Sequence, residues 1–428
     1  MISRPVYRGL LGRAGSVRRR WSVCLVAGGS WAALCGAVPA VADATTAGVT
    51  APEYTFTAKV APGVTFRTFA TSGIGGPALG DLMTIDLRDP RVEVGLLRPP
   101  VVAARRTVSS MANARHAVGG VNGDFFNIGF NIGNTQPGVE ATGSPVGPEV
   151  DDGRPLKAAV PAGQRFGPEL PPATTTEDVI GVGEDERAHV ARLTLQGTIR
   201  SRKATLPLRG LNQYALPVGG AGAFTSDWGG VSRRRAVCGS DTDRDDPCST
   251  DTAEVTVRRG AVVKVEEAVG AGAIPPDTTV LVGREKAAGA LRTLRPGDRV
   301  SVRYRFTGPE RFRFALGGFP ILRDGVPLDG LDTRRPAPRT AAGVGGDGRY
   351  LYLVVVDGRS ARSGGLTVAE LAGLLDRAGA DDAVNLDGGG SSTFVARLPG
   401  EPSATVRNVP SDGTERAVAN GIGVFTRR

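Results

Sequence analysis

Five short segments of the chain place carboxylates, amides and arginines beside glycine-containing turns. Residues 357–360 read Asp-Gly-Arg-Ser, and residues 387–393 read Asp-Gly-Gly-Gly-Ser-Ser-Thr. Three consecutive glycines allow backbone N–H groups to converge on an anion, and two serine hydroxyls would add donors. The loop lacks the lysine of a nucleotide-binding P-loop, so we do not expect ATP or GTP. A tight turn after a strand is the alternative interpretation. The other segments are residues 119–127, 338–343 and 408–416.

The combination of these segments resembles the phosphodiester glycosidase family. The resemblance rests on Asn122-Gly-Asp-Phe-Phe126, Pro338-Arg-Thr340, Asp357-Gly-Arg359, the helix start at 365–367, residues 385–392 and the segment from Pro410 to Arg416. These motifs occur in the family's order and span about residues 115–426. The chain departs from many relatives at Pro336-Ala337, where they carry Arg-His, so the recognition role of that stretch is less secure. Bacterial relatives include proteins described as acting in exopolysaccharide biosynthesis.

The resemblance implies an exported hydrolase that cleaves the glycosidic bond of a sugar-phosphate diester in an envelope or extracellular glycan. A phosphomonoester leaves more easily than the leaving group of an ordinary glycosidase, so its expulsion needs less help from a general acid. The reaction still needs a carboxylate to activate water or attack the anomeric carbon, and hydrogen-bond donors for the phosphate. Asp387, Asp357 and Asp124 are the catalytic candidates, in that order, although each could instead hold the glycine loop in place. The candidates for substrate and phosphate binding are Asn122, Arg339, Thr340, Arg359, Asn385, Gly388, Gly389, Gly390, Ser391, Ser392 and Arg416.

Two other functions remain open at this stage. One is a phosphodiesterase that breaks the P–O bond, and the other is a non-catalytic module that binds anionic polysaccharide. Carboxylates among anion-binding groups favour an enzyme, because a mere binder would avoid like charge. The chain has only two histidines, His116 and His189, in different regions, which argues against a multi-histidine zinc centre. No cofactor is firmly expected; Ca²⁺ or another divalent cation stays open, at the catalytic aspartates or at Asp241, Asp243 and Asp245.

The elements that must position these residues follow from the hydrophobic pattern. Residues 64–97 alternate as antiparallel strands, and residues 254–257 and 261–265 form a hairpin turned at Arg259-Gly260. Residues 350–356 form a fully buried strand, Thr367 and Glu370 form a capping box, and residues 383–386 form a second buried strand. We therefore predict an α+β or mixed α/β fold, with a twisted mixed sheet around this strand–helix–strand core and β-rich N-terminal and middle regions.

The domain organisation is predicted from the strand patterns along the chain and from the extent of the family resemblance. Residues 43–114 are a β-rich region, and residues 115–428 form the glycosidase domain with a β-rich insertion at about 179–306. The proline- and glycine-rich residues 136–176 are expected to form a long loop or lid. Residues 1–42 carry a basic start, an apolar stretch and a small-residue site ending at Ala42, which predicts a secretory signal peptide cleaved after Ala42. A retained membrane anchor is the alternative, and the export route stays open.

Charge and cysteines agree with export. The segment to be removed holds six arginines and no acidic residue, so the net charge falls from +9 for the whole chain to +3 for the mature protein. That charge gives no reason to expect a nucleic-acid partner. Cys238 and Cys248 remain after cleavage, and outside the cell we expect them to form a disulfide. The oligomeric state has no signature in the sequence.

Overall fold

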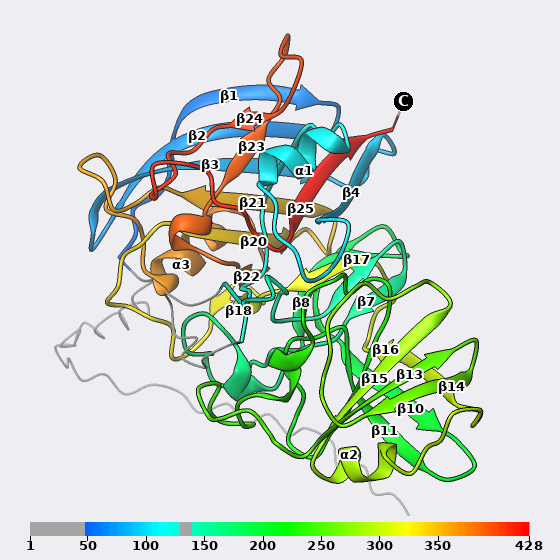
Figure 1. Ribbon diagram of the computed structural model, residues 1–428. Helices are drawn as coiled ribbons and strands as arrows, with labels where there is room; N and C mark the ends of the chain where they lie inside the picture. The colour runs from blue at the N-terminus through cyan, green and yellow to red at the C-terminus, as the bar shows by residue number, and fades with distance from the viewer. Residues whose placement is uncertain (1–47, 129–138, 428) are drawn as a thin grey trace, which may run out of the picture. The chain divides into compact units, whose positions relative to one another are not determined.

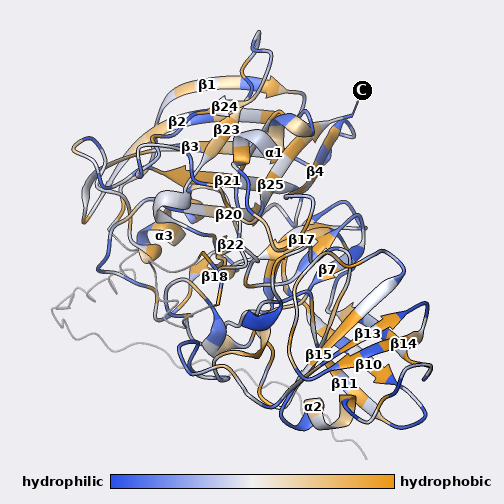
Figure 2. Cartoon of the chain, viewed as in Figure 1, coloured by the Kyte–Doolittle hydropathy of each residue, from blue (hydrophilic) through white to orange (hydrophobic). Residues whose placement is uncertain are grey.

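The computed structural model describes residues 48–128 and 139–427 (Figure 1). The predicted signal peptide at residues 1–42 lies outside them. The described residues form 25 strands and three α-helices, so the protein is predominantly a β protein. Hydrophobic residues concentrate along the strands and hydrophilic ones in the connecting loops (Figure 2). Within the described residues no helix is long and apolar enough to cross a membrane.

The largest sheet has eight strands and includes the predicted strand–helix–strand unit. Helix α3 (Val368–Ala378) begins at the N-cap Thr367, and the capping box with Glu370 is present as predicted. The strands in order across the sheet are β1 (Glu53–Ala61), β2 (Val64–Gly73), β3 (Gly76–Asp86), β21 (Tyr350–Val356), β20 (Arg339–Gly345), β22 (Asp382–Asn385), β18 (Phe319–Arg323) and β19 (Val326–Pro327).

The predicted mixed sheet is only partly confirmed. Strands β21 and β22 run in the same direction and are joined by α3, as a strand–helix–strand unit requires, but β20 lies between them and pairs antiparallel with both. Every strand pair of this sheet is antiparallel. A helical core is absent from the described residues, since α1, α2 and α3 are short and separate. The local pattern of each strand could not reveal that β20, from an earlier part of the chain, is inserted here.

A five-stranded sheet packs against the part of the largest sheet that contains β2 and β3. The rings of Phe66 and Phe394 lie 5.4 Å apart between the two sheets, and a Cβ on Gly119 would come within 2.3 Å of the Met83 side chain. Glycine at position 119 therefore permits this close approach. The strands in order are β24 (Thr405–Val406), β23 (Phe394–Ala396), β5 (Gly119–Asn122), β25 (Gly421–Thr426) and β4 (Val92–Leu97). Helix α1 (Val108–Ala114) is capped by Thr107.

The middle of the chain forms a seven-stranded sheet. The predicted hairpin is present, with Arg258 opposite Ala261 across the turn. Cys238 and Cys248 are joined by the predicted disulfide. The strands in order are β14 (Ala261–Glu266), β13 (Thr252–Arg258), β15 (Thr278–Arg284), β12 (Ala221–Phe224), β11 (Thr205–Leu211), β10 (Thr194–Arg200) and β16 (Ser301–Thr307), with α2 (Lys286–Leu291) after β15; the β11–β12 pair is parallel.

A second five-stranded sheet takes two short strands from the segment predicted to be a long loop or lid. Most of the described remainder of that segment is irregular, and its residues 142–150 are all buried; residues 129–138 lie outside the described ranges. The strands in order are β7 (Arg154–Lys157), β6 (Glu149–Asp151), β17 (Phe312–Gly317), β8 (Asp178–Gly183) and β9 (Ala188–Arg192).

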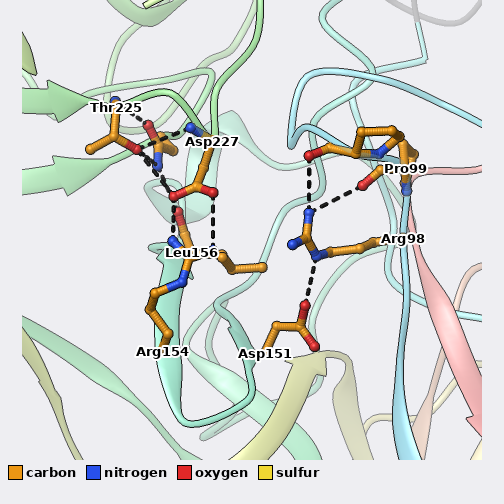
Figure 3. A network of polar contacts seen from close by, with 9 residues as sticks. Arg98, Pro99, Asp151, Arg154, Leu156, Thr225 and Asp227 are labelled. Atoms are coloured by element: carbon orange, nitrogen blue, oxygen red, sulfur yellow. Dashed lines mark hydrogen bonds and ion pairs between the residues drawn. The ribbon is translucent and has the colours of Figure 1, made fainter. Parts of the chain in front are cut away.

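Ion pairs fasten the β6–β7 hairpin to its neighbours (Figure 3). Arg98, directly after β4, pairs with Asp151 at 2.9 Å, and Arg154 on β7 pairs with Asp227, beyond β12, at 2.5 Å. The hairpin thereby contacts the five-stranded sheet that contains β4 on one side and the seven-stranded sheet on the other.

Candidate active site

All five predicted segments meet at one edge of the eight-stranded sheet. Because β20 runs opposite to β21 and β22, its first residues lie beside the last residues of both neighbours. Arg339 at the start of β20 is therefore close to Asp357, which follows β21, and to Asp387, which follows β22. Strand β5 of the adjoining sheet ends at the same place, where the Asp387 N–H donates to the Gly123 carbonyl at 2.8 Å.

Asn122 at the end of β5 ties these segments together. Its Nδ2 donates to the Asp387 carbonyl at 2.6 Å, and its Oδ1 accepts from the Thr340 hydroxyl at 2.8 Å and from the Thr393 N–H at 3.0 Å. Asn122 and Thr340 are both fully buried. Their side chains thus position the loop that follows β22 and are not directed at a substrate.

The glycine loop is held largely by its own hydrogen bonds. Residues 389–391 form a 3-10 turn, and the N–H groups of Gly389 and Ser392 donate to the carbonyls of Pro338 and Gly389. The Ser391 N–H likewise donates to the Gly388 carbonyl. These three N–H groups are therefore not directed at a ligand, and an anion at this loop has to be held mainly by surrounding side chains.

Glycine is required in this loop chiefly for close approach. A Cβ on Gly388 would lie 2.8 Å from the Pro338 carbonyl oxygen, and one on Gly390 would lie 2.1 Å from both Arg416 Nη2 and Asp412 Oδ2. Gly389 also has a φ of 62°, which favours glycine. The triglycine run lets β20 and the 408–416 segment contact the loop from two sides.

The three predicted arginines occupy different environments. Arg359 is exposed and lies against the loop, since a Cβ on Gly389 would be 3.3 Å from its Nη2. Arg416 Nη1 donates to Ser391 Oγ at 3.3 Å, and its guanidinium pairs with Asp412. Arg339 is buried and donates to the carbonyls of Leu366 and Arg335. Arg359 and Arg416 are accordingly the two that flank the loop with solvent access.

The Asp387 carboxyl lies at the centre of this arrangement. Burial among protein atoms raises its pKa to about 7, and the nearby Asp124 carboxyl adds to the increase. A hydrogen bond from Ser391 and the positive charge of Arg416 act in the opposite direction. A carboxyl with such a pKa exchanges its proton near neutral pH, as general acid–base catalysis requires.

Asp357 lies beside a second acid that the sequence analysis missed. Its Oδ1 accepts from the Val409 N–H at 2.8 Å, and burial raises its pKa. Asp81 on β3 is 4% exposed, and burial followed by repulsion from Asp357 raises the Asp81 pKa to about 8. Asp81 lies in an ordinary alternating strand pattern, so the sequence gives no sign that it is buried beside Asp357.

Asp124 is buried behind the loop in a polar network. Its Oδ2 accepts from the Gly147 N–H at 2.6 Å, and burial raises its pKa to about 6. Its N–H donates to Asn420, whose Nδ2 donates to Glu149. Lys157 is fully buried, donates to three backbone carbonyls and has its pKa lowered by burial. The sequence analysis did not find these partners, because Glu149, Lys157 and Asn420 come from separate parts of the chain and belong to no recognisable motif.

Unpartnered polar atoms mark the remainder of the site. Among the described residues, Asn385 Oδ1 and Ser392 Oγ are buried without a hydrogen-bond partner. Arg165 was also missed; its guanidinium carbon lies 5.6 Å and 5.9 Å from the ring centres of Phe125 and Phe319, and it lines a small pocket with Asp124. Buried polar atoms left unsatisfied are costly and are often found at binding sites.

The predicted aspartates do not belong to a cluster of three or more metal-ligating side chains among the described residues. Within the described ranges, the group of three or more side chains that could hold a metal ion together consists of Asp185, His189 and Glu310. Asp241 and Asp243, candidates for calcium, use their carboxylates to accept from the N–H groups of Val218 and Asp245.

The model of the family described as phosphodiester glycosidase matches residues 251–425. The resemblance to the phosphodiester glycosidase family is confirmed. The match contains Asp357, Asp387, Arg359, Arg416 and the glycine loop. Asn122 and Asp124 precede the matched segment, and the hydrogen bonds of Asn122 connect them to it.

Individual relatives of this phosphodiester glycosidase segment are distant. A Bacillus subtilis protein, the SPbeta prophage-derived uncharacterized protein YomE, is 39% identical over 87 residues, which are 20% of this chain and 12% of the relative. A solved structure of a hypothetical protein from Synechocystis has a TM-score of 0.66 at 22% identity, covering 88% of this chain and 64% of that chain. A putative exported protein from Burkholderia pseudomallei has a TM-score of 0.62 at 26% identity, covering 82% and 74%.

Proposed function

We propose that this protein is an exported glycosidase that hydrolyses the bond between a sugar and a phosphodiester in a cell-envelope or extracellular glycan. The observation that carries the proposal is the Asp387 carboxyl, with a pKa of about 7, in a loop flanked by Arg359 and Arg416. The family match supports glycosidase activity. The disulfide and the similarity to a putative exported protein support secretion.

In the proposed reaction the arginines bind the phosphate and the aspartate activates the attacking water. Arg359 and Arg416 bind the phosphate, as arginine does well through paired N–H donors. Ionised Asp387 accepts a proton from water as the water oxygen bonds to the anomeric carbon. The bond from that carbon to the phosphate oxygen breaks, and its electron pair leaves with the phosphomonoester. Because this leaving group is already a stable anion, no strong general acid is required.

The other two aspartates support the same site in this proposal. A general base must present at least one oxygen to water, whereas Asp124 is 3% exposed and its Oδ2 is held by the Gly147 N–H. Asp357 lies beside Asp81 and accepts from the Val409 N–H, which favours a role in holding the 408–416 segment. Asp387 is only partly buried and remains the first choice for the base.

The test is hydrolysis of α-glycosyl phosphodiesters by the purified protein in ¹⁸O-labelled water. We expect the label in the released sugar, because attack occurs at the anomeric carbon. Asp387→Asn should lower kcat by about 10²–10⁴-fold, the usual range for a lost acid–base group. Arg359→Ala should chiefly raise KM. Asp277→Asn is a matched control, since Asp277 is an aspartate in the seven-stranded sheet that pairs with Arg258 and should leave kcat unchanged.

Two outcomes would refute the proposal in favour of the alternatives. Label appearing in the released phosphate would indicate a phosphodiesterase. Absence of turnover over a broad substrate panel, together with glycan binding that Asp387→Asn leaves intact, would indicate a binding module for anionic polysaccharide.

A further inference from the structure

A nitrogen–oxygen donor cluster lies at one end of the five-stranded sheet that contains β8 and β9. Asp185 belongs to the turn between these two strands, His189 is on β9, and Glu310 precedes β17, which pairs with β8 on its other side. One donor atom from each side chain lies within 4.8 Å of the other two. None of these residues is among the predicted catalytic or phosphate-binding groups.

The backbone around the cluster is held in place before any ligand binds. The Gly183 N–H donates to the Arg187 carbonyl at 2.8 Å and closes the turn. The Glu184 N–H donates to the Arg311 carbonyl at 2.8 Å, which ties the turn to the segment that carries Glu310. The His189 ring packs edge-on against Phe312 at 6.2 Å between centres. The three donors therefore come from two fixed strands and one fixed segment.

The cluster combines two carboxylates with an imidazole, which are groups that bind cations. His189 Nε2 lies 3.0 Å and 3.1 Å from the two Asp185 carboxylate oxygens, and Glu310 brings a second carboxylate. No arginine or lysine among the described residues makes an ion pair with either carboxylate. The arginines nearby in sequence have other partners, since Arg187 donates to the Asp347 carbonyl and Arg313 pairs with Glu186. Two carboxylates thus converge on an imidazole, and no arginine or lysine of the described residues neutralises them.

We propose that Asp185, His189 and Glu310 bind one divalent transition-metal ion, with Zn²⁺ as the favoured ion. Imidazole favours zinc over calcium or magnesium, and one imidazole with two carboxylates leaves a fourth position for water. Ligands of tetrahedral zinc are about 3.3 Å apart, so the side chains must move inward by about 1 Å. Because Glu310 stands in the connection from β16 to β17, the ion would fasten the β8–β9 turn to the chain leaving the seven-stranded sheet.

The test is isothermal titration of the full chain, free of any histidine tag and first treated with chelator, with ZnCl₂. We expect one strong site per chain with a dissociation constant in the micromolar range, weaker binding of Ca²⁺ and Mg²⁺, and a rise in Tm on adding zinc. Glu310→Gln and His189→Asn should each weaken zinc binding at least tenfold. Glu186→Gln is the matched control, because it removes a carboxylate from the same turn but lies outside the cluster.

The outcome of this test does not depend on whether the proposed glycosidase activity is found. Titration and Tm need no turnover, so they stand whether or not a substrate is found. Glu310→Gln replaces a side chain with no ion pair in the described residues and should fold normally by circular dichroism. Zinc affinity that is absent, or that stays the same in both variants, would overturn the proposal.

Discussion

Removal of the Asn122 side chain is the sharpest test of how this site is assembled. The amide is fully buried and makes three hydrogen bonds, to the Asp387 carbonyl, the Thr340 hydroxyl and the Thr393 N–H. Asn122→Ala leaves these three groups without their partner in the protein interior. A buried polar group that loses its partner costs about 1–3 kcal/mol, so we expect the free energy of unfolding to fall by roughly 3–9 kcal/mol for the three groups together.

The same substitution should impair catalysis beyond its effect on stability. Without the Asn122 amide, the backbone at Asp387 is free to shift, and a displacement of about 1 Å can lower a rate by about 10²-fold. Urea unfolding monitored by tryptophan fluorescence gives the free energy, and kcat measured well below the melting temperature gives the second effect. Asn122→Asp keeps the acceptor oxygen but loses the donor to Asp387, so it should also lower kcat.

Asn212 provides a matched control elsewhere in the molecule. It is equally buried, and its amide also makes three hydrogen bonds, to the Leu156 carbonyl and to the hydroxyl and N–H of Thr225. Asn212→Ala should therefore destabilise the protein at least as much, particularly because its φ of 44° disfavours alanine, yet leave kcat nearly unchanged. A loss below 1 kcal/mol for Asn122→Ala, or equal losses of kcat in both variants, would refute this account of the site.

Three further changes have expected outcomes. Gly390→Ala should lower stability by less than about 1 kcal/mol, because the side chains it meets are flexible, but displacing Arg416 should raise KM several-fold in steady-state kinetics. The raised Asp81 pKa of about 8 means that the folded state holds the proton more tightly than the unfolded state does. Stability should therefore fall as pH rises from about 4 to about 8, and Asp81→Asn should remove up to about 4 kcal/mol of the fall measured by urea melts between pH 5 and pH 9. Replacing Cys238 and Cys248 by serine should cost about 2–3 kcal/mol by the same melts, and an unchanged midpoint would contradict this.

The sequence predicted the elements whose signals are local. The hairpin turned at Arg259-Gly260, the helix capped by Thr367 and Glu370, and the buried strand β21 all occur where the pattern placed them. Each depends on neighbouring residues, through turn chemistry, capping hydrogen bonds or a continuous apolar run. The family resemblance could also be recognised from the sequence, because the glycine loop and its flanking aspartate are contiguous in it.

The sequence could not predict the contacts and the burial that result from pairing between strands far apart in the chain. Insertion of β20 between β21 and β22 brings Arg339 to the site edge and at the same time buries it, and no local signal distinguishes this arginine from the solvent-accessible Arg359. The N–H groups of the glycine loop looked free to bind an anion, but their partners include the carbonyl of Pro338, fifty residues earlier. Lys157 and Asp81 are charged residues in strands, and their burial depends on sheets that pack only in the folded chain.

Strand β25 lies between β5 and β4, so residues 421–426 complete a sheet begun more than three hundred residues earlier. The strand that carries Asn122 therefore lacks one neighbour until residues 421–426 have been synthesised. Contacts between such distant residues slow folding, because a large loop must close before they form. Deleting residues 421–426 would consequently take away an interior strand, and we expect the deletion product to stay unfolded.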